Sequence, residues 1–173
     1  ANSFGVIVES LCYMPGYGIA DAATTLVGQS IGAGRHELMK RFAWLSVGLG
    51  VTVMAVMGVV MYVGAPVAMA MMTPAEEVRR LGVEVLRIEA FAEPMFAAAI
   101  VSYGVFVGAA KTLVPSIMNL VSIWGVRISL AALLAPSMGL RGVWIAMCIE
   151  LCFRGMIFHV NLWTWKLKLQ KKI

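Results

Sequence analysis

From Leu45 to Met72 the chain runs for 28 residues without a charged side chain. The hydrocarbon core of a bilayer is about 30 Å thick, and about 20 apolar residues in helical conformation cross it. A helix surrounded by water keeps at least one polar face, which this segment lacks. Hydrophobic residues make up 61% of the chain and charged residues only 13%. The sequence therefore predicts an all-α integral membrane protein.

Five membrane-spanning helices are predicted from the distribution of apolar residues. They cover about residues 4–33, 42–72, 83–110, 113–134 and 143–165, and together they form one helical lobe over residues 1–165. A tight turn is expected over residues 136–141. Pro94 should leave the carbonyl of Ala90 without its helical donor, because proline has no backbone N–H. Residue 1 already lies close to a hydrophobic segment, which indicates a piece of a longer protein.

The basic residues predict an orientation, because cytoplasmic loops carry an excess of Lys and Arg. With five spans, three basic residues fall on one side, namely Arg79, Arg80 and Arg141. The other side collects eight, namely Arg35, Lys40, Arg41, Lys111, Lys166, Lys168, Lys171 and Lys172. This places the C-terminus and the basic tail, residues 166–173, in the cytoplasm. This placement explains the net charge of +5, so the lipid bilayer is an expected partner and nucleic acid is not.

Three motifs resemble the multidrug and toxic compound extrusion (MATE) family of transporters. The stretch from Met14 to Arg35, MPGYGIADAATTLVGQSIGAGR, resembles a helix that occurs once in each of the two six-helix lobes of that family. Residues 104–115 and 124–144 resemble the closing helices of the second lobe. The resemblance implies that residues 1–173 are the eighth to twelfth helices of a twelve-helix protein of the cell (inner or plasma) membrane. The N-terminal lobe of the same transporter would then be a missing partner.

The resemblance also implies a function. Such a protein is expected to be a cation-coupled antiporter, using H+ or Na+, that exports amphipathic organic compounds by alternating access. Beyond the coupling ion, no cofactor is expected. Two alternatives stay open: a flippase for lipids or lipid-linked sugars of the same superfamily, and a structural membrane subunit that does not transport.

An enzyme is not predicted. The two histidines lie 123 positions apart, and no D-x-x-D cluster occurs. The chain also has no G-x-S-x-G motif. Neither catalytic residues nor metal ligands are therefore expected.

Acidic residues inside the spans are the candidates for cation coupling or substrate binding. An ionised acid deep in a span costs at least about 2.5 kcal/mol on insertion scales, so Asp21 should face a partner or a wet cavity. Glu89, Glu93, Phe96 and Tyr103 would share one stripe of a continuous helix, and the backbone break at Pro94 lies beside Glu93. Transporters build cation sites where irregular backbone lines a cavity, and a buried carboxyl can exchange a proton near neutral pH.

Small residues are expected at helix contacts, where they let backbones approach closely. Gly28 and Gly32 form a G-x-x-x-G pattern on the face that carries Asp21. The three cysteines lie in apolar segments without a metal-site spacing, so we expect them to be small packing residues.

Charged pairs at helical spacing are expected on two helices. Glu84 and Arg87 are three residues apart near the membrane surface, and Glu150 and Arg154 are four apart within a span. The second pair is predicted to be a structural ion pair. Arg127 has no partner in its own span, so it must find one on another helix or extend to the membrane surface.

Overall fold

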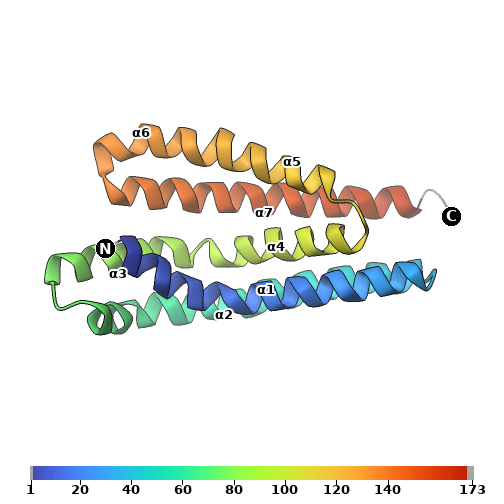
Figure 1. Cartoon of the computed structure of the whole chain (residues 1–173), viewed down its shortest axis with the longest axis horizontal. Coiled ribbons are helices and arrows are strands. Elements are labelled where there is room, and N and C mark those ends of the chain that lie inside the picture. Colours follow the sequence, from blue (N-terminus) through green and yellow to red (C-terminus); the bar gives the residue numbers. More distant parts are fainter. Residues whose placement is uncertain (1, 171–173) are drawn as a thin grey trace.

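The computed structural model describes the backbone of residues 2–170 and the side chains of residues 2–165. Within this part of the chain every regular element is helical. The longest helices run roughly parallel or antiparallel to one another (Figure 1). Their bounds are α1 Asn2–Gly32, α2 His36–Met72, α3 Glu76–Ala90, α4 Glu93–Gly108, α5 Leu113–Val121, η1 Ser122–Ile128, α6 Ser129–Met138 and α7 Leu140–Gln170. The prediction of an all-α protein is confirmed.

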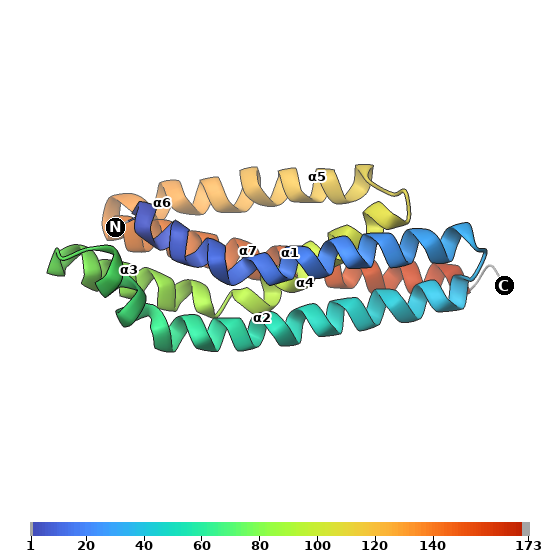
Figure 2. The same ribbon diagram turned by 60° about the horizontal axis from the view of Figure 1, so that its bottom comes forward.

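Helices α1 and α2 form a long antiparallel hairpin and lie side by side in both views (Figures 1 and 2). Gly34 ends α1 with a positive φ of 69°, which glycine adopts without a Cβ clash. The N–H of Gly34 donates to the carbonyl of Ile31, and that of Arg35 donates to the carbonyl of Ser30. These two bonds satisfy carbonyls that the end of a helix leaves free.

The third predicted span is broken. Helix α3 ends at Ala90, α4 begins at Glu93, and the two axes differ by 55°. The cause is Pro94, which cannot donate to Ala90, so the helical ladder restarts one turn later. The predicted break at Pro94 is therefore present, but it divides the span into two helices.

The fourth predicted span is continuous but changes type in its middle. Between α5 and α6 the seven residues of η1 form a π-helix, which the sequence did not indicate. The expected turn over residues 136–141 is wrong in extent, because α6 continues through Pro136 and α7 begins at Leu140. Gly139 alone, with φ of 59°, reverses the chain, since its missing Cβ permits that conformation.

Among the described residues, three helical stretches are long and apolar enough to cross a membrane: 36–72, 113–138 and 140–165. The bent pair α3 and α4 counts as a fourth if it is taken as one span. Helix α1 has 31 residues but is not among them, although it packs along α2 and α4. The chain is thus a multi-pass membrane protein, and α1 as a fifth span stays a prediction.

The largest apolar core lies where α1, α2, α4 and α7 meet, around Val27, Met39, Val101 and Phe158, all at most 1% exposed. In the membrane, such contacts hold helices by close packing. Of the three free cysteines, Cys12 is buried in a second apolar cluster, as expected of a small packing residue.

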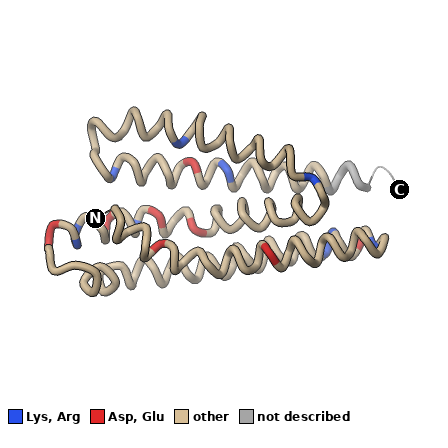
Figure 3. Tube along the Cα trace, viewed as in Figure 1, with Lys and Arg blue, Asp and Glu red and all other residues tan. Residues whose placement is uncertain are grey.

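Charged residues occur partway along the helices as well as near the ends of the bundle (Figure 3). At one end Arg141, at the start of α7, forms an ion pair with Glu84 of α3. The predicted Glu84–Arg87 pair is therefore wrong, because a partner from another helix competes for the same carboxylate.

Candidate functional site

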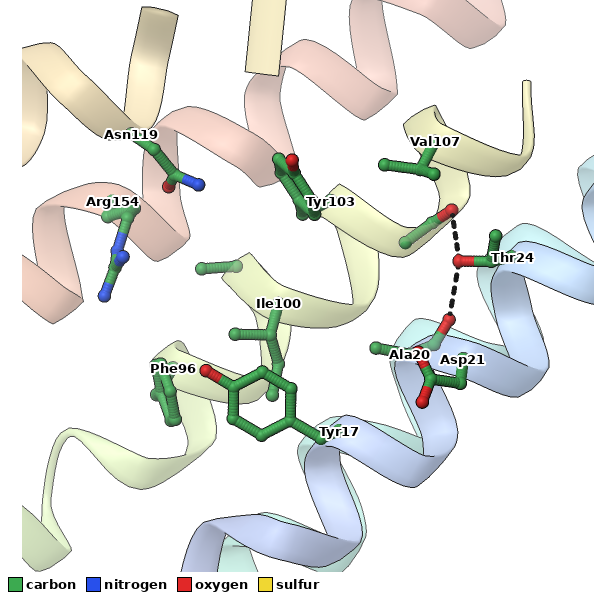
Figure 4. A pocket seen from close by; sticks show the side chains of 12 residues that line it. Tyr17, Ala20, Asp21, Thr24, Phe96, Ile100, Tyr103, Val107, Asn119 and Arg154 are labelled. Atoms are coloured by element: carbon green, nitrogen blue, oxygen red, sulfur yellow. Dashed lines mark hydrogen bonds between the residues drawn. The ribbon is translucent and has the colours of Figure 1, made fainter. Parts of the chain in front are cut away.

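A cavity of about 490 Å³ lies between α1, α4, α5 and α7 (Figure 4). Its size and its mixture of apolar walls with a few polar groups are usual for small-molecule sites. Three aromatic rings and four polar side chains stand among its lining residues, namely Tyr17, Phe96 and Tyr103, and Asp21, Thr24, Asn119 and Arg154.

Asp21 supplies the negative charge of this cavity. It follows Tyr17 by four residues on α1, so both side chains lie on the same helical face. Asp21 is exposed, and its carboxylate has no hydrogen bond or ion pair to any residue that the structure describes. This position agrees with the expectation that Asp21 faces a cavity, and Phe96 and Tyr103 also line it as candidates for substrate contact.

The opposite wall carries a positive charge that is already neutralised. Arg154 Nε lies 3.2 Å from Oε1 of Glu150, whose side chain is 0% exposed. The Ser122 hydroxyl donates to the same oxygen at 2.6 Å. The Arg154 guanidinium also lies 5.7 Å from the centre of the Phe96 ring. The ion pair that the spacing predicts is thus formed, and it leaves Asp21 as the uncompensated charge of the cavity.

Glu89 and Glu93 are both 2% exposed, and neither lines this cavity. The expectation that Glu89 shares one stripe with Phe96 and Tyr103 is wrong, because the 55° bend separates Glu89 from the face of α4. Glu93, the first residue of α4, lies beside Gly58 of α2 instead. One carboxylate oxygen of each acid is buried without a hydrogen-bond partner among the described residues.

The break between α3 and α4 packs directly against α2. A Cβ atom on Gly58 would lie 2.7 Å from the carbonyl oxygen of Ala90, so only glycine permits this approach. That carbonyl is the group that Pro94 leaves without a helical donor. The broken backbone and the buried acids therefore lie at one level of the bundle, as the sequence indicated.

A second cavity of about 430 Å³ lies beside the first and contains Glu9 and Arg127. The two cavities share Tyr17, Phe96 and Arg154. Glu9 is half-buried and interacts electrostatically with both Glu89 and Glu93. The acids of α1, α3 and α4 thus influence one another across the helix contacts.

Aromatic rings stand where the two cavities meet. The centres of Tyr13 and Tyr17 are 5.5 Å apart, and Phe96 lies 5.9 Å from Tyr13 and 6.2 Å from Tyr17, all edge to face. Rings in this arrangement attract one another beyond their area of contact. They form the wall between the cavities.

Arg127 finds its partner on another helix, as expected. One guanidinium nitrogen donates to the sulfur of Met147 on α7. Ser122, five residues earlier, also bonds to α7 through Glu150. The i to i+5 hydrogen bonding of the π-helix allows both residues of η1 to face the same neighbour.

The close approach of α1 and α4 depends on glycines of α4 more than on the predicted motif. A Cβ on Gly28 would lie 3.4 Å from the carbonyl of Gly108, an ordinary contact, and one on Gly32 would have no neighbour within 4 Å. Gly104 and Gly108 instead lie against the backbone of α1 at Ala20 and Thr24. Gly32 therefore makes no close helix contact among the described residues, because α4 already ends at Gly108, opposite Thr24 and Gly28.

Sequence reasoning missed Tyr13, Tyr17 and Asn119. Tyr17 could have been found, since it precedes the candidate Asp21 by one helical turn. Asn119 could not, because its place depends on how α5 packs beside α7.

The family model described as MatE matches residues 1–133. A protein of Mesorhizobium japonicum, "Probable multidrug resistance protein NorM", is 32% identical over 154 residues, which is 85% of this chain and 33% of that protein. A protein with the same description from Thermotoga maritima is 28% identical over 161 residues, which is 90% of this chain and 34% of that protein.

Two solved structures share the fold. One shows the inward-facing conformation of a multidrug resistance MATE family transporter of the MOP superfamily, with a TM-score of 0.87, 17% identity, and coverage of 96% of this chain and 39% of that one. The other is a MATE in complex with MaL6, with a TM-score of 0.88, 16% identity, and coverage of 98% and 39%. The chain thus spans about a third of the length of the curated relatives it matches.

Proposed function

The chain belongs to the MatE family, and from this membership we propose that it forms one lobe of a cation-coupled antiporter that exports amphipathic organic compounds. Transport would proceed by alternating access, in which this lobe moves against a second lobe of the same protein. The relatives are described as multidrug resistance proteins, and the chain covers about a third of each. The complete transporter would lie in the cell membrane with the C-terminus in the cytoplasm.

The observation that carries this proposal is the cavity with Asp21 as its uncompensated charge. An amphipathic cation would place its apolar part against Tyr17, Phe96 and Tyr103, and its positive group near Asp21. Cations are also attracted to the faces of aromatic rings. A cavity of about 490 Å³ is within the range that takes drug-sized molecules.

Cation coupling is assigned to the buried acids, with Glu93 as the first candidate and Glu89 as the second. Both lie at the broken span, away from the cavity that would hold the substrate. A carboxylate oxygen without a hydrogen-bond partner among the described residues is a group that gains from binding H+ or Na+. The coupling ion would then bind at the start of α4 and at the end of α3, and the substrate would lie along the rest of α4, from Phe96 to Val107.

The flippase alternative needs a positive group that can bind a lipid head group inside the cavity. Arg154 is the cationic residue of this cavity, and Glu150 already neutralises it. We therefore favour export of an organic cation over flipping of an anionic lipid.

The test is efflux of ethidium by the whole gene product that contains this chain, in cells that lack their own efflux pumps. We expect Asp21→Asn to lower ethidium efflux at least tenfold, because the cavity loses its charge, while Glu77→Gln on the exposed start of α3 leaves it unchanged. Glu93→Gln should abolish efflux that is driven by an imposed H+ or Na+ gradient. Unchanged gradient-driven efflux in Glu93→Gln would contradict its coupling role, and unchanged efflux in Asp21→Asn would contradict its substrate role.

A further inference from the structure

An apolar crevice of about 390 Å³ opens on the other side of the broken span. It lies between α2 and the junction of α3 with α4, and is lined by Ala55, Gly58, Val59, Tyr62, Ala90, Phe91 and Pro94. None of these residues lines either of the cavities described above. The crevice is therefore separate from the proposed transport site.

The surface around the crevice is apolar and exposed. The side chain of Phe91 is 72% exposed and that of Val59 is 65% exposed. The neighbouring valines of α2 are exposed to a similar degree, among them Val56, Val60 and Val63 at 55–70%. In a membrane protein such a face is suited to contact with acyl chains.

The break in the helix creates the crevice. Phe91 projects from the two-residue junction between α3 and α4 and meets the ring of Tyr62, with 5.8 Å between the ring centres. Gly58 brings α2 against the backbone of Ala90, so the floor of the crevice lacks side chains that would fill it. A slot with aromatic sides and a backbone floor results, and it can hold a linear hydrocarbon chain.

An arginine stands at one end of this slot. The guanidinium of Arg87 lies 5.0 Å from the centre of the Tyr62 ring, and its Nε donates to the Tyr62 carbonyl at 3.5 Å. Arg87 is exposed, and Glu84, which its spacing would favour as partner, pairs with Arg141 instead. Four of the five guanidinium N–H groups thus remain for an outside acceptor, and phosphate suits their geometry.

The depth of Arg87 in the membrane matches that of a phosphate group. Arg41 is the last charge before the uncharged part of α2, and Tyr62 lies 21 residues after it, which is about 32 Å at 1.5 Å per residue. This distance is about the thickness of the hydrocarbon core. With Arg41 at one surface, Tyr62 and Arg87 lie at the other, and the last ten residues of α2, which the sequence places within the span, then extend past the hydrocarbon core. Beyond Arg87 the next acids of this span, Glu89 and Glu93, are buried.

We propose that this crevice binds a phospholipid of the surrounding bilayer, with one acyl chain in the slot and the phosphate on Arg87. Charge complementarity selects the occupant: an apolar slot that ends in a free cation at head-group depth fits an anionic phospholipid. An uncharged ligand would use the slot but not Arg87.

The experiment is native mass spectrometry of the whole gene product that contains this chain, titrated with dioleoyl phosphatidylglycerol in detergent. Two variants address the two halves of the site: Arg87→Gln removes the charge, and Val59→Trp fills the slot. Arg80→Gln, an exposed arginine two turns earlier on α3, is the matched charge control. Val67→Trp is the matched size control, because Val67 is also 65% exposed on α2 but lies outside the crevice.

We expect Arg87→Gln to weaken binding of the tightest phosphatidylglycerol about fivefold, the effect of one basic residue near a membrane surface. Val59→Trp should reduce occupancy at least as much, and both controls should bind as the unaltered protein does. Equal binding by all four variants would overturn the proposal. This result is expected if another segment of the complete protein covers the crevice. Loss of lipid in Val59→Trp alone would also overturn it, since the phosphate would then not be recognised.

Discussion

The hydroxyl of Thr24 on α1 donates to the carbonyl of Gly104 on α4 at 2.9 Å, and the carbonyl of Ala20 shares the same proton at 3.0 Å (Figure 4). This bond joins two helices that line the proposed substrate cavity, one turn from Asp21. It is possible because Gly104 has no side chain that would separate the helices.

Replacement of Thr24 by valine keeps the shape of the side chain and removes the donor. Interhelical hydrogen bonds in membrane proteins contribute about 0.6 kcal/mol on average and up to about 1.7 kcal/mol. We expect Thr24→Val to lower the free energy of unfolding within this range, measured by unfolding in mixed micelles. Thr52→Val is the control, because the exposed Thr52 hydroxyl bonds only within its own helix, to Gly48. An equal effect of both changes would contradict an interhelical role for Thr24.

Alanine at Gly108 should destabilise the lobe. A Cβ there would overlap the backbone of Thr24, which cannot move without separating α1 from α4. Overpacking of this kind costs about 1–3 kcal/mol. Gly32→Ala, at a site where a Cβ has no neighbour within 4 Å, should change the free energy of unfolding by less than about 0.5 kcal/mol. A larger effect at Gly32 than at Gly108 would restore the motif glycines as the packing contact.

Removal of Glu150 should be among the most damaging changes on α7. Glu150 is 0% exposed and neutralises Arg154, whose side chain is 12% exposed. Breaking a buried pair by removing one partner costs about 3–5 kcal/mol, because the other charge stays buried. We expect Glu150→Leu to lower the free energy of unfolding by this amount in the same unfolding assay. The double variant Glu150→Leu with Arg154→Met should recover most of the lost stability. A double variant no more stable than Glu150→Leu would show that the two residues act independently.

The wall between the two cavities should limit substrate size. Tyr17 borders both cavities and contacts Tyr13 and Phe96 through its ring. If the proposed function holds, Tyr17→Ala should join the cavities and raise the export of large substrates relative to that of ethidium. Tyr62→Ala, on α2 in the separate crevice, should leave the ratio of the two export rates unchanged. The measurement is the ratio of efflux rates for two dyes of different size. A ratio unaltered by Tyr17→Ala would mean that the wall does not set the size limit.

Much of the fold follows from local rules that act within one helix. The uncharged run ending at Met72 predicts a long helix, and Pro94 predicts the break, because each effect involves only neighbouring residues. Glu93 is buried at this break, and its part in coupling stays a prediction.

The arrangement of the candidate site was less predictable, since it depends on which helices become neighbours. Glu84 pairs with Arg141 and not with its helical neighbour Arg87. Glu89 leaves the stripe of Phe96 because the direction of a bend is set by packing, here by Gly58 against Ala90. The spacing of residues along the sequence predicts which of them share a helical face only as long as the helix is unbroken.

The π-helix η1 affects which single-residue deletions the protein can tolerate. Ser122 and Arg127 face α7 together because residues five apart are only about 50° apart around a π-helix, which has about 4.4 residues per turn, whereas in an α-helix they would be about 140° apart. An in-frame deletion of a single codon between these two residues would let the segment return to α-helix, and the tighter winding would compensate for the lost residue. Ser122 and Arg127, then four residues apart, would still face α7, and the flanking helices would nearly keep their faces. We expect such a deletion to be tolerated better than one within α5 or α6, where every side chain before it would turn by about 100° relative to α7.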